Sequence, residues 1–184
     1  NTDIGLENAN VEYSDDGIIV NEHLQTSSKH IFAAGAVLDG KFSTTEALLQ
    51  SRIAANNIIK PRSKISPNYS IIPRTISSIP EIASVGLTED DCIKRDLRIK
   101  TAIAPISLIA RSNTEDFQSG FVKIICDKKG KILGGSIVAP EASSMIQEIG
   151  LAIKLEISAH ELAELPHAFQ SWNEAIRVCA SRIK

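Results

Sequence analysis

The chain has 184 residues, of which 43% are hydrophobic and 23% are charged, with a formal net charge of −2. This is typical of one or two globular units with a buried core. The absence of a basic block argues against a nucleic-acid or anionic-membrane partner, and no apolar run approaches the ~18 residues of a membrane span. The chain opens at Asn1 without a signal-like segment, so we expect it to be part of a longer protein.

The three cysteines stand far apart, at positions 92, 126 and 179, and none belongs to a C-x-x-C pair. An odd, scattered set does not predict a disulfide framework. We therefore expect buried, reduced thiols and a cytoplasmic location. The histidines show no ligand-type spacing, so the sequence predicts no metal site.

The first third of the chain alternates short apolar segments with loops. Gly17–Val20 and Ile31–Gly35 are predicted strands, and Gly40 lies in the loop that follows. Ser43 or Thr44 is placed to cap a helix. Small residues recur on one face of that helix, and we expect this face to pack closely on a neighbour: Ala47, Ser51, Ala54, Ala55 and Ile58.

A linker is predicted at 60–68, where prolines, serines and cations occur together. It separates a first domain, 1–65, from a second, 66–184. A loop is expected at 109–119. Strands are expected at 71–77, 82–87 and 97–105, and capping boxes begin helices at Thr88/Asp91, Ser158/Glu161 and Ser171/Glu174.

The clearest pattern lies at 120–156. The apolar runs Phe121–Cys126 and Ile132–Val138 flank a polar tip in which Gly130 can take a positive φ, as in a β-hairpin. The stripe of the following helix comprises Ala142, Met145, Ile146, Ile149, Ala152 and Ile153. The predicted fold class is α+β: an antiparallel sheet with helices on one side, preceded by a short α/β segment.

A resemblance to the class I pyridine nucleotide–disulfide oxidoreductases is carried by three stretches. GFVKIICDKKGKILGGSIVAPEASSMIQEIGLAI and IPEIASVGLTEDD resemble the dimerisation domain of this family, which includes dihydrolipoamide dehydrogenase, glutathione reductase and mercuric reductase. VNEHLQTSSKHIFAAGAV resembles the segment of these enzymes in which the chain re-enters the FAD domain. The resemblance implies that 1–65 ends an FAD domain and that 66–184 forms a homodimer interface.

The resemblance also implies a parent protein that passes electrons from NAD(P)H through FAD to an acceptor. FAD is expected in the parent but is not expected to be retained by this chain, because the main nucleotide-binding βαβ unit is absent. The acceptor and the choice between NADH and NADPH stay open. Mercury is disfavoured as a substrate, because Cys179 stands alone near the C-terminus.

The resemblance places Gly35, Ala36, Ser43, Thr44 and Thr45 at the flavin. A strand that ends in glycine lets backbone N–H groups approach a phosphate or polyol, and a helix N-terminus stabilises negative charge on reduced flavin. Family members carry Asp at position 36 to bind the ribityl chain. Ala36 offers no such acceptor, so flavin contact is weakened. The simpler interpretation of Ser43 or Thr44 is a helix cap.

The resemblance aligns a second segment with the family pattern His-x-His-Pro-Thr-x-x-Glu. Glu174 matches the Glu and His167 matches the first, non-catalytic His, whereas Phe169 occupies the position of the base and Gln170 that of the proline. A phenyl ring cannot carry a proton, so disulfide chemistry is in doubt. His167 could act as the base only in a shifted geometry; otherwise it is a partly buried or interfacial His, and Glu174 is a capping residue.

Two functions follow from these observations. The chain is either the C-terminal part of an FAD-dependent NAD(P)H oxidoreductase or a non-catalytic dimerisation or interaction module. Ala36 and Phe169, which replace the family's Asp and base, fit the second function. They also fit an oxidoreductase whose acceptor is not a disulfide.

Overall fold

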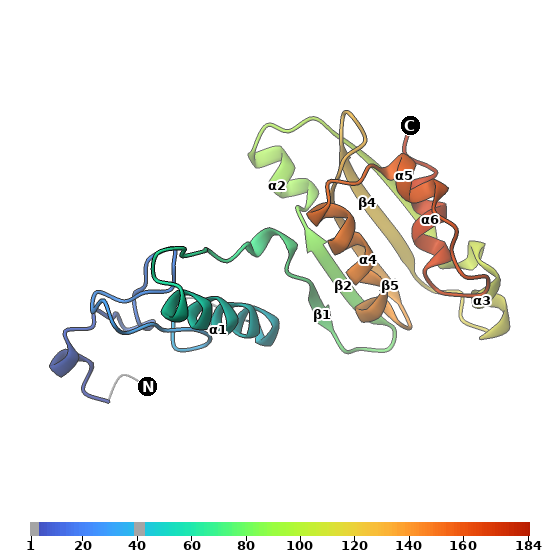
Figure 1. Ribbon diagram of the computed structural model, residues 1–184. Helices are drawn as coiled ribbons and strands as arrows, with labels where there is room; N and C mark the ends of the chain where they lie inside the picture. Colours follow the sequence, from blue (N-terminus) through green and yellow to red (C-terminus); the bar gives the residue numbers. More distant parts are fainter. Residues whose placement is uncertain (1–3, 39–42) are drawn as a thin grey trace. The chain divides into compact units, whose positions relative to one another are not determined.

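The structure is a computed structural model that describes residues 4–38 and 43–184. The chain divides into two compact units, Asn1–Tyr69 and Ser70–Lys184, and each is described by itself (Figure 1). This division lies a few residues beyond the expected boundary after residue 65.

Unit 1 consists of one long helix, α1 (Thr44–Ile59), packed on loops, with a short 3-10 turn at Leu6–Ala9. The two predicted strands occur here as isolated bridges rather than as ladders, pairing Ile18 with Leu38 and Phe32 with Gln25. The expected loop residue Gly40 lies outside the described residues. The core of unit 1 comprises Leu6, Val11, Ile18, Leu24, Ala33, Leu38, Ile53 and Ala54.

Ser43 caps α1, as predicted. Its Oγ accepts the Glu46 N–H at 3.2 Å, and Glu46 Oε2 accepts the Ser43 N–H at 2.7 Å. The predicted packing face of this helix is only partly correct: Ala54 is buried, but Ser51, Ala55 and Ile58 are exposed. The buried face is partly polar, because its polar side chains satisfy backbone groups of the loops; it comprises Glu46, Gln50, Ile53, Ala54 and Asn57.

Asn57 explains why the linker belongs to unit 1. Its fully buried amide Nδ2 donates to the His23 carbonyl at 2.9 Å and to the Ile65 carbonyl at 2.8 Å. Its Oδ1 accepts the Ile65 N–H at 2.9 Å. The first part of the linker is therefore fastened to unit 1, and the unit extends to Tyr69.

Unit 2 is built on a five-stranded antiparallel sheet in the order β1-β2-β5-β4-β3 (Figure 1). This confirms the predicted fold class. The strands are β1 (Arg74–Ile76), β2 (Glu81–Gly86), β3 (Ile99–Pro105), β4 (Phe121–Asp127) and β5 (Ile132–Ala139).

The predicted hairpin between β4 and β5 is confirmed. Asp127 Oδ1 accepts the N–H groups of Lys129 at 2.8 Å and Lys131 at 2.9 Å. Gly130 closes the turn with φ +87°, a conformation that a residue with a Cβ rarely adopts. The local turn chemistry therefore sets the register of the two central strands.

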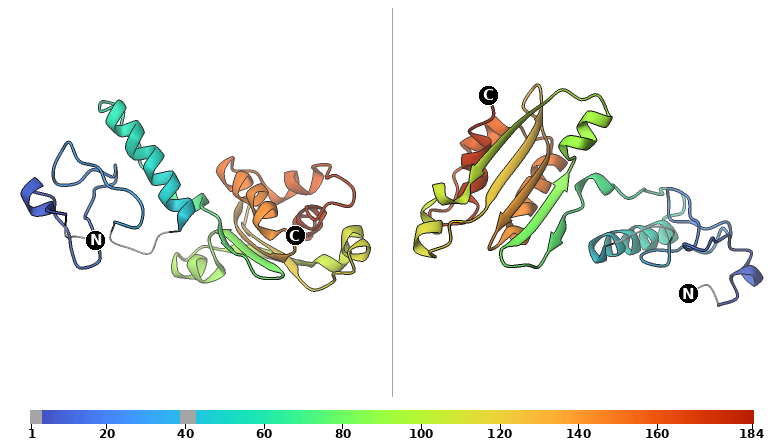
Figure 2. Two further views of the ribbon diagram at one scale, coloured as in Figure 1. Left: turned by 90° about the horizontal axis from the view of Figure 1, so that it is seen from below. Right: turned by 180° about the vertical axis from the view of Figure 1, so that it is seen from behind.

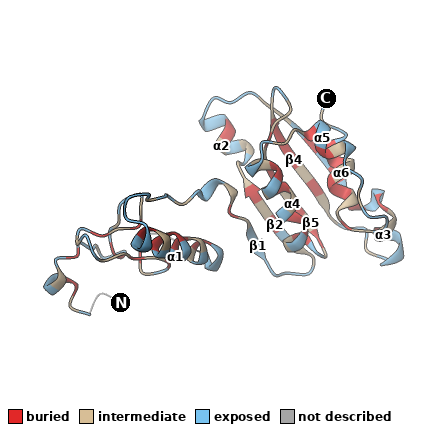
Figure 3. Ribbon diagram, in the orientation of Figure 1, coloured by how far each residue is buried: buried red, intermediate tan, exposed pale blue. Residues whose placement is uncertain are grey.

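Helices α4 (Ala142–Lys154), α5 (Ala159–Glu164) and α6 (Glu174–Ala180) cover one side of the sheet, whereas the short α2 (Glu89–Lys94) lies on the other (Figure 2, left). Five residues of the predicted stripe on α4 are buried and form the centre of the core (Figure 3): Ala142, Met145, Ile146, Ile149 and Ala152. A short helix, α3 (Ala110–Thr114), and a 3-10 turn at Ile106–Leu108 lie at and just before the position where a loop was expected.

The capping boxes that begin α2 and α5 are confirmed, at Thr88 and at Ser158. The capping box predicted at Ser171 is wrong. Ser171 Oγ is buried without a hydrogen-bond partner, and α6 begins instead after Asn173. The carboxylate of Glu174 binds a different backbone N–H, that of Gln170.

Candidate functional site

The turn at Gly35 is closed by contacts within unit 1. Gly35 has φ +81°, and a Cβ there would lie 3.2 Å from Ala47 Cβ, so glycine suits both the turn and the close approach of α1. Its N–H donates to Gln50 Oε1 at 2.7 Å, and its carbonyl accepts the Leu38 N–H at 3.0 Å. The Gly35 N–H, which the sequence suggested for cofactor contact, is therefore used inside the unit.

The start of α1 lies open to solvent. Ala36, Ser43, Thr44 and Thr45 are all exposed. Ser43 acts as the helix cap together with Glu46, which agrees with the simpler interpretation of this residue. The first turn of a 16-residue helix carries partial positive charge, so this end can stabilise an anionic or electron-rich group.

The second predicted site lies in the Phe169 loop, which we define as Leu165–Asn173, between α5 and α6. Phe169 is 77% exposed. The His167 side chain is only 5% exposed: its Nε2 lies 2.7 Å from Glu148 Oε1, and its Nδ1 lies 2.8 Å from the Leu165 carbonyl oxygen. Both ring nitrogens of His167 therefore face oxygen atoms of the protein.

Glu174 holds the backbone of the same loop. Its Oε2 accepts the Gln170 N–H at 3.0 Å, and Gln170 has φ +60°. A proline has no N–H and cannot adopt this φ, so the family pattern with proline here requires a different local backbone. Glu174 and His167 have separate partners, and the structure does not bring them together as an acid–base pair.

Three polar residues of these sites were missed by sequence reasoning. Glu148 Oε2 accepts a hydrogen bond from Asn173 Nδ2 at 2.7 Å, and the fully buried Gln50 donates through Nε2 to the Tyr69 hydroxyl at 3.1 Å. Glu148 and Gln50 could have been noticed as polar residues next to the apolar face of a helix. The helical period locates such a residue but does not identify the group to which its side chain binds.

The three cysteines all lie in unit 2. All three cysteines are free and buried, as predicted. Burial raises the pKa of Cys126 to about 12 and that of Cys179 to about 11, so both stay protonated at neutral pH. Since the thiolate is the nucleophile and metal ligand, the raised pKa values disfavour reaction at Cys126 and Cys179.

Within residues 4–38 and 43–184, no group of three or more His, Cys, Asp or Glu side chains is arranged to hold a metal ion. In the same described part of the chain, no helix is long and apolar enough to cross a membrane.

The antiparallel five-stranded sheet covered by helices makes unit 2 an α+β domain, and its family follows from a comparison with known proteins. Residues 72–179 match the family model described as pyridine nucleotide-disulphide oxidoreductase, dimerisation domain. The chain belongs to this family, and the resemblance inferred from its sequence is confirmed.

Curated relatives extend the match through unit 1. The chain is 32% identical over 179 residues to a dihydrolipoyl dehydrogenase of Buchnera aphidicola and 34% identical over 176 residues to one of Bacillus subtilis. These alignments cover 96% and 94% of this chain but only 37% and 36% of those enzymes. An uncharacterized 19.7 kDa protein in a mercuric resistance operon of Staphylococcus aureus is 32% identical, over 90% of this chain and 94% of that protein.

Solved structures share this fold. LpdA of Mycobacterium tuberculosis is similar with a TM-score of 0.89 and 27% identity, over 98% of this chain and 40% of LpdA. The HOCl-induced flavoprotein disulfide reductase RclA of Escherichia coli has the same fold over 98% of this chain and 42% of its own, with a TM-score of 0.88 and 23% identity.

Proposed function

We propose that this chain is the C-terminal part of an FAD-dependent NAD(P)H oxidoreductase similar to dihydrolipoamide dehydrogenase. In this function it supplies the dimer interface and part of the flavin site. The observation that carries the proposal is the continuous match to dihydrolipoyl dehydrogenases over 96% of the chain, which includes unit 1 as well as the dimerisation domain. The three buried free thiols support a reducing, cytoplasmic location.

The flavin contribution is assigned to Gly35, Ala36, Ser43, Thr44 and Thr45. The exposed, capped start of α1 supports this assignment, because its partial positive charge favours a reduced, negatively charged flavin ring. The internal hydrogen bond of the Gly35 N–H and the missing acceptor at Ala36 both weaken the contact. The chain therefore contributes an edge of the site, and most FAD contacts belong to the rest of the parent protein.

We expect the purified chain to be colourless, because it lacks the βαβ unit that binds the bulk of a dinucleotide. Joining it to the part of the Bacillus subtilis dihydrolipoyl dehydrogenase that it does not match should produce a chimera that retains about one FAD per chain. Absorbance at the flavin bands measures the FAD content of the isolated chain and of the chimera. A colourless, folded chimera would contradict the proposed function, and a yellow isolated chain would contradict the assignment of most contacts to the missing part.

His167, within the Phe169 loop, and Glu174, directly after it, are the candidate residues for proton handling. Their geometry favours indirect action: Glu174 orients the loop backbone, and His167 is held by Glu148. Because Phe169 occupies the position of the family base, we propose an acceptor other than a disulfide, such as a quinone. Flavin reduction by NAD(P)H does not require this base.

The chain is expected to form a homodimer. One cross-strand row on the sheet face opposite α4 is apolar, and Ile76 and Ile82 in this row are 61% and 41% exposed. This outer row comprises Ile76, Ile82, Val138, Phe121 and Pro105. On the helical side, Phe169 and Leu165 are exposed as well. Such apolar surface is usually buried by a partner, and two-fold symmetry is the commonest arrangement.

Light scattering at micromolar concentration should therefore give twice the monomer mass of 19.9 kDa. A single monomeric species over the whole micromolar range would contradict this expectation.

The second candidate function, a non-catalytic dimerisation or interaction module, is favoured by the replacements at Ala36 and Phe169 and by the enclosed ring of His167. A relative of similar extent is the 19.7 kDa Staphylococcus aureus protein. The chimera separates the two functions: a module that has lost its flavin site would give a dimeric but colourless chimera.

A further inference from the structure

A hollow lies at one corner of the sheet of unit 2, where β3 begins and β4 ends. The antiparallel pairing of Ile99 with Asp127 brings the loop before β3, residues 96–98, beside the β4–β5 turn, residues 127–129. The hollow has a volume of about 520 Å³, and we call it the basic hollow. Two segments far apart in sequence thus share one surface, which is lined by Asp96, Leu97, Arg98, Asp127, Lys128 and Lys129.

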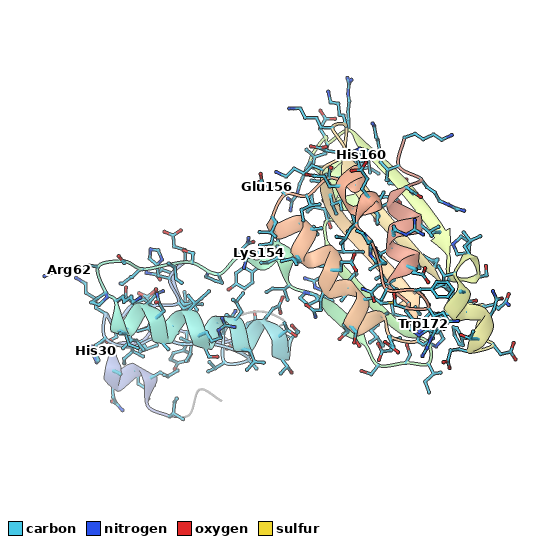
Figure 4. The ribbon with its side chains drawn as sticks, turned by 45° about the vertical axis from the view of Figure 1, so that its right-hand side comes forward. His30, Arg62, Lys154, Glu156, His160 and Trp172 are labelled. Atoms are coloured by element: carbon cyan, nitrogen blue, oxygen red, sulfur yellow. The ribbon has the colours of Figure 1, made fainter. Side chains whose placement is uncertain are left out.

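The basic hollow gathers three exposed cations. Within residues 4–38 and 43–184, no ion pair includes Arg98, Lys128 or Lys129. The next cation of the turn, Lys131, is paired instead: its Nζ lies 2.7 Å from Oε1 of Glu156, which follows α4 (Figure 4). Positive charge is therefore concentrated at the basic hollow, although the whole chain has a formal net charge of −2.

The two acidic residues of the basic hollow offset only part of this charge. Asp127 is engaged by its own turn, because its Oδ1 accepts the N–H groups of Lys129 at 2.8 Å and Lys131 at 2.9 Å. Asp96 is exposed and lies just after α2, with φ +51°. An anionic ligand in the basic hollow would therefore be attracted by three cations and opposed mainly by Asp96.

The backbone of the turn favours a peptide ligand over a small phosphate. Phosphate sites typically aim backbone N–H groups at the anion. Here the N–H groups of Lys129 and Lys131 are bound by Asp127 Oδ1, and the Gly130 N–H donates to the Asp127 carbonyl at 3.0 Å. The basic hollow instead offers long, flexible cations around Leu97, which is 41% exposed. Such a surface suits a segment that carries several carboxylates and an apolar side chain.

We propose that the basic hollow is a docking site for an acidic peptide segment of a partner protein. Arg98, Lys128 and Lys129 attract the carboxylates of this segment, and Leu97 packs against an apolar side chain between them. Exposed charges of this kind speed the encounter and set its selectivity, and salt screens them. The proposal goes beyond the proposed function, because it depends neither on the flavin nor on the homodimer.

Fluorescence anisotropy of labelled synthetic peptides with the full chain is the first test. The acidic peptide EEELEEE should bind about tenfold or more tightly than its neutral counterpart QQQLQQQ. Raising the salt from about 50 mM to about 300 mM should weaken the binding of EEELEEE severalfold. Equal affinity for the two peptides, or no binding of EEELEEE, would overturn the proposal.

Charge reversal tests whether the peptide binds at the basic hollow. Arg98→Glu combined with Lys128→Glu should weaken the binding of EEELEEE by about tenfold or more, because two attractions become repulsions. The matched control combines Arg52→Glu on α1 with Arg74→Glu on β1, both at exposed positions. It makes the same change in net charge and should have a much smaller effect. Circular dichroism checks that both double variants are folded, and an equal loss of affinity in the two would overturn the site.

Asp96→Asn is the opposite test, because it should strengthen binding. Asn tolerates the positive φ at this position, so the variant removes one negative charge and keeps the backbone. The affinity for EEELEEE should rise severalfold. An unchanged affinity would mean that the peptide binds elsewhere and would overturn the site.

Two further comparisons test the class of ligand. Leu97→Ala should weaken the binding of EEELEEE but leave that of EEEAEEE unchanged, because only the first peptide has an apolar side chain to lose. Inorganic tripolyphosphate should displace EEELEEE poorly. If tripolyphosphate binds more tightly than EEELEEE, or if Leu97→Ala affects both peptides equally, the docking of an acidic and apolar peptide segment is wrong.

Discussion

Replacing Phe169 by His is expected to raise disulfide turnover strongly when this chain replaces the matching part of the Bacillus subtilis dihydrolipoyl dehydrogenase. The unaltered chimera should reduce artificial dyes or quinones with NADH but turn over its dihydrolipoyl substrate slowly, because phenyl cannot carry a proton. A positioned base is typically worth ~10²–10⁴-fold in rate. The measurement is steady-state kcat and kcat/KM with both acceptor types.

From the structure, we expect that Phe169→His alone gives only part of this increase in disulfide turnover. Glu174 is engaged with the Gln170 N–H at 3.0 Å, and Gln170 has φ +60°. Proline at position 170 removes this N–H and excludes this φ, which frees Glu174 to orient the new His. The double variant Phe169→His, Gln170→Pro should therefore exceed Phe169→His alone.

His167→Ala is the control for this series, and it should change turnover little by comparison. Two results would show that His167 is the base: an unaltered chimera as fast on dihydrolipoyl substrate as the Bacillus subtilis enzyme, or a folded His167→Ala variant without turnover. Dye reduction serves as the internal standard, since it reports flavin reduction without the base.

Ile146→Ala is expected to destabilise unit 2 by about 2–5 kcal/mol, which is the usual cost of truncating a buried aliphatic side chain to Ala. Ile146 is fully buried between α4 and the sheet, where backbone and side chains leave little room to close the cavity. A Cβ on Gly135, for example, would lie 2.8 Å from the neighbouring Ile149 Cδ1. Leu151→Ala, on the exposed side of the same helix, should cost much less.

Urea unfolding followed by Trp172 emission measures this difference for unit 2, because Trp172 belongs to its core. A similar loss for Ile146→Ala and Leu151→Ala would mean that another partner covers the exposed side of α4 in solution. In that case the dimer dissociation constant of Leu151→Ala should be compared with that of Gln147→Ala, a control at another exposed position on α4.

Local patterns were sufficient where a structure depends on residues close in sequence. The β4–β5 hairpin follows from two apolar runs and the turn at Asp127–Gly130, and the buried stripe of α4 follows from its helical period. The capping boxes at Ser43, Thr88 and Ser158 were predictable because each one joins the N-cap residue to an acidic residue three positions later. The same rule failed at Ser171, because a tertiary contact decided which N–H the Glu174 carboxylate binds.

The sequence by itself determined the family and the α+β class, because both follow from local patterns and residue types. Only the tertiary structure decided that Gln50 closes the Gly35 turn, that Asn57 fastens the linker, and that Glu148 holds the loop. Each of these polar side chains satisfies buried or partly buried groups far away in sequence. Burial makes an unsatisfied polar group costly, so the choice of partner follows from three-dimensional proximity and not from spacing along the chain.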